Sequence, residues 1–245
     1  MYHFFVEQEQ IGPETVTVTG SDVNHIKNVL RMKPGEEVLI SSRDGGDYLC
    51  RVAELDADTV RMEILNARES SMELPARIHL FQGLPKSDKL ELIIQKAVEL
   101  GAYRIIPVET KFTVVRLDKK KEEAKKKRWN AIAESAAKQS KRSRIPEVTG
   151  VRSFEEALKE ADSHDLKLIP YECANGIKAT RELIEKAAPG MDIAVFIGPE
   201  GGFAEEEIAK AKEAGILPVT LGKRILRTET AGLCILSALM LQLEE

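Results

Sequence analysis

Alternating apolar and polar residues mark the first part of the chain. Five short segments with this pattern predict strands: YHFFVE, TVTVTG, EVLISS, YLCRVAEL and TVRMEIL. Turn-forming residues separate them, at Gly12-Pro13, Lys33-Pro34-Gly35 and Asp44-Gly45-Gly46. One segment, SDVNHIKNVLRM, instead has apolar residues at helical spacing, which predicts a helix capped by Ser21 or Asp22. Several short strands with one helix favour a small β-barrel.

The pattern changes after the polar stretch NARESSMELP, so we expect a domain boundary near residues 67–74. Beyond it, apolar segments predict strands at RIHLFQGL, YRIIPVET, LKLIPYE, DIAVFIG and ILPVTLG. Predicted helices alternate with them: SDKLELIIQKAVELG with Ser87 as cap and Gly101 as stop, residues 119–140, SFEEALKEA with a capping box at Ser153 and Glu156, AEEEIAKAKEAG, and TETAGLCILSALMLQL. This alternation predicts an α/β domain with a mostly parallel sheet.

Composition narrows the class of protein. The chain has 245 residues and a net charge of −4, with 43% hydrophobic residues but no apolar run of the roughly 18 residues that span a membrane. The N-terminus lacks the features of a signal peptide. Cys50, Cys173 and Cys234 are far apart and the four histidines do not cluster, which disfavours a zinc site or disulfides. We therefore expect a cytoplasmic protein without a bound metal.

Positive charge is concentrated in two stretches. RLDKKKEEAKKKR, residues 116–128, mixes lysines with acids and is typical of a solvated helix face. KQSKRSR, residues 138–144, has four positive charges and no acid. Because the chain is not basic overall, a nucleic-acid partner would have to be bound by such local patches.

The segment FIGPEGGFAEEE, residues 196–207, follows a predicted strand of the α/β domain, where ligands bind. Its glycines, Gly198, Gly201 and Gly202, let the backbone approach a ligand closely. Neither dinucleotide nor P-loop spacing is present, and Glu200 with Glu205–Glu207 would repel phosphate. The three acids at 205–207 are expected to interact favourably with the positive end of the dipole of the helix that they begin. A ligand without phosphates suits this loop better.

A second loop, LGKRILRTET, residues 221–230, complements the first. Leu221, Ile225 and Leu226 are expected to form an apolar slot for an adenine ring, although Ile225 and Leu226 are also compatible with ordinary core. The cations Lys223, Arg224 and Arg227 suit an RNA phosphate or a developing negative charge on a base.

These two loops in order resemble the signature of the bacterial 16S rRNA uridine-N3 methyltransferases, a branch of the SPOUT methyltransferases. The resemblance covers nearly the whole chain, including HIKNVLRMKPGEEV, QGLPKSDKLELIIQKAVELG, RWNAIAESAAKQSKRSRIPEV and IPYE. It implies a PUA-like RNA-binding β-barrel over residues 1–70, and a SPOUT domain with a C-terminal trefoil knot over residues 74–245. It also implies a homodimer, S-adenosyl-L-methionine as cofactor, and 16S rRNA of the small (30S) ribosomal subunit as substrate, with m3U1498 as the family's product.

Site residues follow from the motifs that match. Those expected at the cofactor are Leu84, Glu172, Ile197, Gly198, Glu200, Gly201, Gly202, Leu221, Gly222, Ile225, Leu226 and Thr230. Those expected at RNA are Arg31, Lys111, Arg116, Gln139, Arg142, Arg144, Lys223 and Arg224. Arg227 is the candidate to stabilise the deprotonated uridine, and Glu200 or Glu229 is the candidate base.

Two positions depart from the family. His3 stands where a basic residue is frequent, and Phe112-Thr113 replaces a frequent Arg-Ser pair, so Lys111 and Arg116 are expected to hold RNA instead. Three alternatives remain: a non-catalytic RNA-binding protein of this fold, a SPOUT enzyme acting on tRNA or a ribose 2′-OH, and a nucleotide-dependent dehydrogenase. The intact loops disfavour the first, the long matching motifs disfavour the second, and the missing nucleotide fingerprint disfavours the third.

Overall fold

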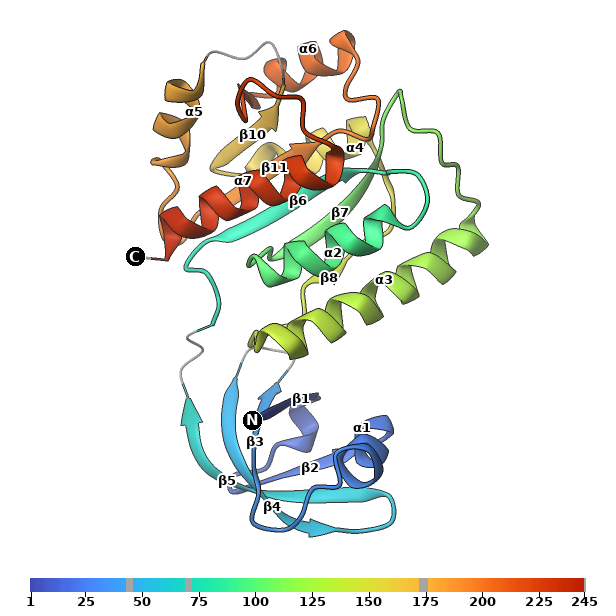
Figure 1. Ribbon diagram of the computed structural model, residues 1–245, viewed down its shortest axis with the longest axis vertical. Helices are drawn as coiled ribbons and strands as arrows, with labels where there is room; N and C mark the ends of the chain where they lie inside the picture. The colour runs from blue at the N-terminus through green and yellow to red at the C-terminus, as the bar shows by residue number, and fades with distance from the viewer. Residues whose placement is uncertain (43–45, 69–71, 172–175, 245) are drawn as a thin grey trace. The chain divides into compact units, whose positions relative to one another are not determined.

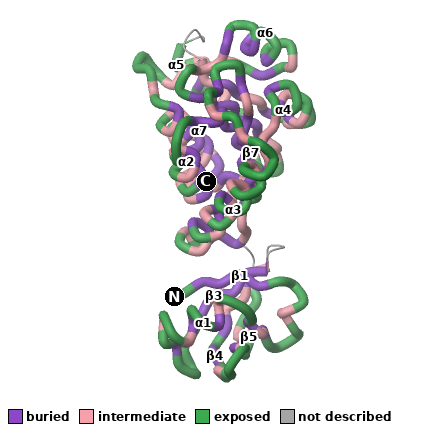
Figure 2. The backbone as a smooth tube through the Cα atoms, turned by 90° about the vertical axis from the view of Figure 1, so that its right-hand side faces the viewer, coloured by how far each residue is buried: buried purple, intermediate pink, exposed green. Residues whose placement is uncertain are grey.

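The computed structural model describes residues 1–42, 46–68, 72–171 and 176–244. It divides into two units: Met1–Glu73 together with Ala137–Ile145, and Leu74–Ala136 together with Pro146–Glu245. Figure 2 shows buried positions along the strands of both units. The short segment 137–145 therefore belongs with the N-terminal unit, although it lies well beyond the boundary expected from the sequence.

The N-terminal unit is built on a curled five-stranded sheet in the order β1-β3-β4-β5-β2 (Figure 1). The strands are β1 Tyr2–Val6, β2 Thr15–Thr19, β3 Glu37–Ser42, β4 Asp47–Leu55 and β5 Thr59–Arg68. β1 pairs parallel with β3, and the other pairs are antiparallel. Apolar residues alternate toward one core, with Phe4, Val16, Ile40 and Met62 among its buried members. All five strands predicted from the alternation are confirmed.

The expected helix after β2 forms, but its geometry is different. It consists of α1 Ser21–Asn24 followed by one π-helical segment, His25–Val29. The predicted cap is wrong: Gly20, with a φ of 73°, is the N-cap, and Ser21 and Asp22 lie inside the first turn. Glycine tolerates this backbone conformation because it has no Cβ.

The second unit contains a seven-stranded parallel sheet in the order β12-β10-β11-β6-β7-β8, with β9 also pairing with β7. The strands are β6 Arg77–Gly83, β7 Arg104–Glu109, β8 Glu147–Val148, β9 Arg152–Ser153, β10 Leu166–Pro170, β11 Asp192–Ile197 and β12 Leu217–Val219. The central strands β6 and β11 are buried along almost their whole length, as is typical of strands covered on both faces.

Helices cover both faces of this sheet (Figure 1). They are α2 Lys89–Glu99, α3 Lys119–Ser140, α4 Phe154–Glu160, α5 Ile177–Ile184, α6 Glu205–Glu213 and α7 Thr228–Leu243. α4 and α6 pack against the face that carries Phe81 and Phe196, whose rings stack 4.4 Å apart. α2 and α7 lie side by side against the other face. The predicted mostly parallel α/β domain is confirmed.

Helix ends decide two further predictions. Ser153 accepts a hydrogen bond from the backbone N–H of Glu156, so the predicted capping box of α4 is confirmed. The predicted cap of α2 is wrong, because Ser87 has a φ of 56° and Asp88 is the N-cap.

Candidate active site

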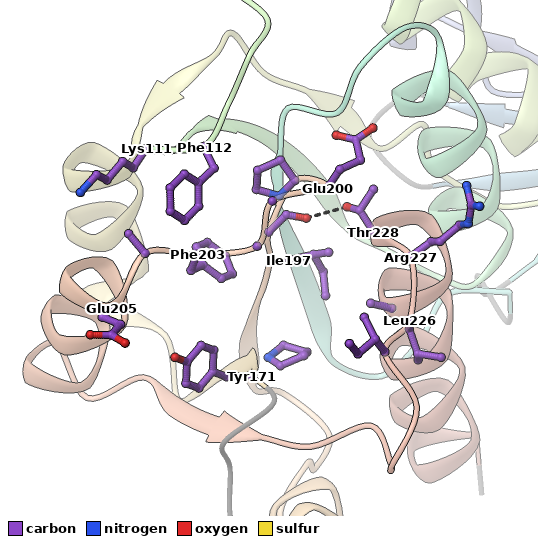
Figure 3. Close-up of a pocket in the computed structure, with 18 of the residues that line it drawn as sticks. Lys111, Phe112, Tyr171, Ile197, Glu200, Phe203, Glu205, Leu226, Arg227 and Thr228 are labelled. Carbon is purple, nitrogen blue, oxygen red and sulfur yellow. Dashed lines mark hydrogen bonds between the residues drawn. The ribbon is translucent and has the colours of Figure 1, made fainter.

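A pocket lies where the ligand-binding edge of a parallel sheet is expected, beyond the carboxyl ends of β7, β10 and β11 (Figure 3). Its volume is about 930 Å³, near the upper end of the roughly 300–1,000 Å³ usual for ligand sites. Its walls come from five separate segments and are formed by Lys89, Lys111, Phe112, Pro170, Tyr171, residues 197–206, residues 225–228 and Ala231.

The loop after β11 brings main chain close to this pocket. Gly202, with a φ of 68°, donates its backbone N–H to the carbonyl of Pro199 and closes a tight turn. A Cβ built on Gly198 would lie 3.0 Å from the backbone of Gly202, and one on Gly83 would lie 2.5 Å from Pro199. Side chains at these glycines would therefore force the loop open.

Thr228, the first residue of α7, connects the two loops predicted to carry the chemistry. Its hydroxyl donates to the carbonyl oxygen of Gly198 at 2.6 Å and accepts from Nε2 of Gln82 at 2.9 Å (Figure 3). Gln82, at the end of β6, is fully buried and also donates to the carbonyl of Gly83. One hydroxyl thus fixes the start of α7 to the ends of both β11 and β6.

An ion pair and a backbone hydrogen bond position the carboxylate of Glu200. Its Oε1 accepts from Nζ of Lys89 at 2.9 Å and from the backbone N–H of Lys86 at 3.1 Å. Partial burial would raise the pKa of this carboxyl, but these hydrogen bonds outweigh burial and lower it. Figure 3 shows the carboxylate pointing away from the centre of the pocket. A carboxylate with a lowered pKa is a weak base, so the geometry favours a positioning role.

Glu229 lies near the same lysine, with its Oε2 3.9 Å from Nζ of Lys89. That oxygen is buried and has no hydrogen-bond partner among the described residues. Glu229 is not one of the residues that line the pocket. Arg227, by contrast, lines the pocket and is exposed at its rim, next to Thr228 (Figure 3).

The turn after β7 forms the opposite wall. The hydroxyl of Thr113 accepts the backbone N–H of Thr110 at 2.9 Å, and Glu207 accepts the backbone N–H of Lys111 at 2.8 Å. Glu207 also accepts the backbone N–H of Ala204 at 2.9 Å, which caps the start of α6 as the sequence predicts for these acids. This buried carboxylate therefore connects the turn after β7 to the loop after β11.

Most of the predicted cofactor residues are brought together. Those that line the pocket are Ile197, Gly198, Glu200, Gly201, Gly202, Ile225 and Leu226. Leu84 is buried and lines a separate small cavity, and Leu221, Gly222 and Thr230 are not part of the pocket wall. Glu172 lies outside the described residues. Lys89 and Tyr171 were not predicted to be site residues, and Phe112 was not predicted to line the pocket. Because Phe112 and Tyr171 closely follow β7 and β10, the strand-end rule was the signal that would have found them.

One residue predicted to contact RNA is buried. Arg142 is only 3% exposed, and its guanidinium pairs with the carboxylate of Glu73 in the N-terminal unit. The next residue, Ser143, donates its hydroxyl to Asp47 in the same unit. Arg31, Gln139, Lys223 and Arg224 are exposed, and Arg144 is partly buried. Lys111 and Arg116 are also exposed, and pair with Glu206 and Glu109.

A second polar cluster lies at the opposite, amino-terminal edge of the parallel sheet. Asp192 accepts hydrogen bonds from Arg77 at 2.5 Å and is 3.1 Å from Nε2 of His79. Burial and the neighbouring His164, 4.5 Å away between ring centroids, lower the pKa of His79 to about 4. Within the described residues, no group of three or more His, Cys, Asp or Glu side chains is placed to hold a metal ion. In the same part of the chain, no helix is long and apolar enough to cross a membrane.

Family models match both parts of the chain. The model of an RNA methyltransferase domain matches residues 72–240, and that of an RNA methyltransferase PUA domain matches residues 18–65. Among curated proteins, the ribosomal RNA small subunit methyltransferase E of Bacillus subtilis is 38% identical over 250 aligned residues, covering 100% of this chain and 98% of the relative. The protein of the same name from Mycobacterium tuberculosis is 31% identical, over 96% of this chain and 89% of the relative.

Solved structures agree in fold. The ribosomal RNA small subunit methyltransferase E of Neisseria gonorrhoeae, bound to S-adenosyl methionine, is 34% identical, with a TM-score of 0.85 over 97% of this chain and 96% of that one. A Legionella pneumophila protein in complex with the same cofactor is 31% identical, with a TM-score of 0.84 over 97% of this chain and 96% of that one. The chain therefore belongs to the RNA methyltransferase family that includes the ribosomal RNA small subunit methyltransferase E proteins.

Proposed function

We propose that this chain transfers a methyl group from S-adenosyl-L-methionine to the N3 of a uridine in the decoding region of 16S rRNA, in the small ribosomal subunit of the cytoplasm. One observation carries the proposal. The loop 198–202 and the segment 225–228, both expected from the family motifs, line one pocket and are joined by the hydrogen bond from Thr228 to Gly198.

The residues present fit this cofactor. Gly198 and Gly202 bring bare backbone to the pocket, where N–H and C=O groups can contact an adenine edge. Ile197, Leu226 and Ile225 supply apolar surface for its ring, and Ile225 is 90% exposed, which suits a side chain that a ligand covers. Acids line the pocket at Glu205 and Glu206, which suits a positively charged sulfonium better than a phosphate. When bound, the cofactor supplies an electrophilic methyl group.

The protein's own residues must then prepare the uridine. N3 of uracil becomes nucleophilic only when its proton leaves, and the resulting charge spreads onto O2 and O4. Arg227, on the pocket rim, is the cation we assign to that charge. Lys89 binds Glu200 and thereby positions the loop 198–202. The methyl donor and the uracil ring then meet in a near-attack geometry.

We propose a homodimer as the functional form. α7 carries an outward row that includes Thr230, Cys234 and Leu241, and Leu241 is 70% exposed although it is apolar. This exposed row of α7 is the surface that we assign to the contact between the two copies. We also propose the family's trefoil knot, supported by the return of the chain from the edge strand β12 to the ends of β6 and β11, where Thr228 is bound.

The test is methyl transfer from labelled S-adenosylmethionine to small ribosomal subunits from cells that lack the endogenous enzyme, followed by nucleoside analysis of the RNA. The expected product is 3-methyluridine in the decoding region. A product in tRNA, or on a ribose 2′-OH, would refute the uridine-N3 assignment while keeping the cofactor site.

A further inference from the structure

Phe112 is an aromatic side chain that the family motifs do not account for. It lines the pocket, yet 45% of its surface is exposed to solvent. Tyr171 and Phe203 also line the pocket, but both are partly buried and pack against the core beneath the sheet. Phe112 is thus the most open of these three rings, and its exposure leaves room for a ligand to cover it.

The backbone holds this ring in a fixed direction. Thr110 and Thr113, on either side, close the turn through a backbone hydrogen bond of 3.0 Å and a side-chain bond of 2.9 Å. Glu207 holds the N–H of Lys111. On the other side, a Cβ built on Gly201 would lie 2.8 Å from Cβ of Phe112, so the side chain rests directly on the glycine loop. A preorganised aromatic ring loses little entropy when a ligand stacks on it.

The position of Phe112 suits the second ligand of the reaction. A methyl transfer needs donor and acceptor in one cavity, and the volume of about 930 Å³ has room for both. Figure 3 shows Phe112 and Lys111 across the pocket from Leu226, Arg227 and Thr228. Lys111, next to Phe112, is 54% exposed, and its ammonium pairs with the carboxylate of Glu206 at 2.7 Å.

Resting on the proposed function, we propose that Phe112 is the platform on which the target uridine stacks after it leaves its RNA stack. Enzymes that modify a base must extrude it, and aromatic side chains compensate for the lost stacking. Uracil stacks on the exposed face of Phe112, its N3 edge turned toward the opposite wall and Arg227.

The test compares Phe112→Ala, Phe112→Trp and the control Val114→Ala, an exposed apolar residue nearby that does not line the pocket. On small ribosomal subunits, Phe112→Ala is expected to raise the KM for RNA by about tenfold or more, the size of a lost base–aromatic stack. Phe112→Trp should restore it, Val114→Ala should match the wild type, and cofactor affinity by calorimetry should change less than about twofold. An unchanged KM would overturn the proposal. Parallel loss of cofactor affinity would also overturn it, because Phe112 would then support only the Gly201 loop.

A second measurement separates this proposal from the proposed function. Uridine-rich RNA carrying 5-iodouridine, which crosslinks to a stacked aromatic ring under light, is bound to the wild-type protein with S-adenosylhomocysteine and mapped by mass spectrometry. A crosslink at Phe112 supports the platform even if small subunits are not methylated. Crosslinks only at other residues would refute the platform, even if the protein does methylate small subunits.

Discussion

Replacing the Thr228 hydroxyl by a methyl group is the most direct test of how the pocket is held together. Thr228→Val keeps the shape and removes the oxygen that bonds Gly198 and Gln82. Both side chains are buried, with Thr228 at 5% and Gln82 at 0% exposure. We expect the loop 198–202 to loosen at its first residue.

The magnitude follows from the groups left behind. Gln82 keeps one hydrogen bond, to the carbonyl of Gly83, whereas the carbonyl of Gly198 loses the donor that Thr228 supplied. Leaving a buried polar group without its partner costs about 1–3 kcal/mol, so the free energy of unfolding should fall by about that amount. If cofactor binding must reorder the loosened loop at a cost of about 1–2 kcal/mol, cofactor affinity falls about 5- to 30-fold.

Calorimetric titration of S-adenosylmethionine and urea unfolding measure the two quantities. Thr228→Ser, which keeps the hydroxyl, should bind like the wild type. Thr149→Val is the matched control, because Thr149 is equally buried and donates to the carbonyl of Gly150 but does not line the pocket. It should lose stability without losing affinity. Equal affinity for Thr228→Val and Thr228→Ser would refute this account of the pocket.

Three further outcomes are expected. Lys89→Ala, which frees Glu200, should weaken cofactor binding about two- to fivefold, and Lys89→Arg should not; the same loss at high and low salt would argue against an ion pair. Folding lowers the pKa of His79 from 6.5 to about 4. As the pH falls, the imidazole of His79 is therefore protonated in the unfolded chain before it is protonated in the folded protein. The free energy of unfolding should therefore decrease between those pH values by up to about 1.4 kcal/mol per pH unit, with a shallower slope in His79→Gln; an equal slope would contradict the assignment. Leu241→Glu should convert the proposed dimer to a monomer in light scattering, while a monomeric wild type would refute the dimer.

Local pattern was enough to predict most elements of secondary structure. The helix over residues 119–140 coincides with α3, and the strands of both sheets, apart from the two-residue strands β8 and β9, lie where alternating or continuous apolar runs predict them. These features depend on neighbours in the chain, which is why they can be predicted. The wrong caps, at Ser87 and at Ser21 or Asp22, show the limit of the method. Several residue types can cap a helix, and tertiary packing chooses the backbone angle.

The family and the glycine-rich loop were likewise accessible from the sequence, because long motifs carry both, and the family assignment is confirmed. Motifs did not predict the other pocket walls. The ends of the predicted strands point to Phe112 and Tyr171, but only the parallel sheet brings them and Lys89, from three distant segments, to one edge.

Charged residues illustrate the difference between local pattern and three-dimensional surroundings. The sequence determined that residues 138–144 are basic, but only the fold decided that Arg142 is buried against Glu73 while Lys141 remains exposed. It also decided that Glu200 is bound to Lys89, a residue 111 positions away. A side chain's type is fixed by the sequence, whereas its partner, its burial and hence its pKa are properties of the space around it.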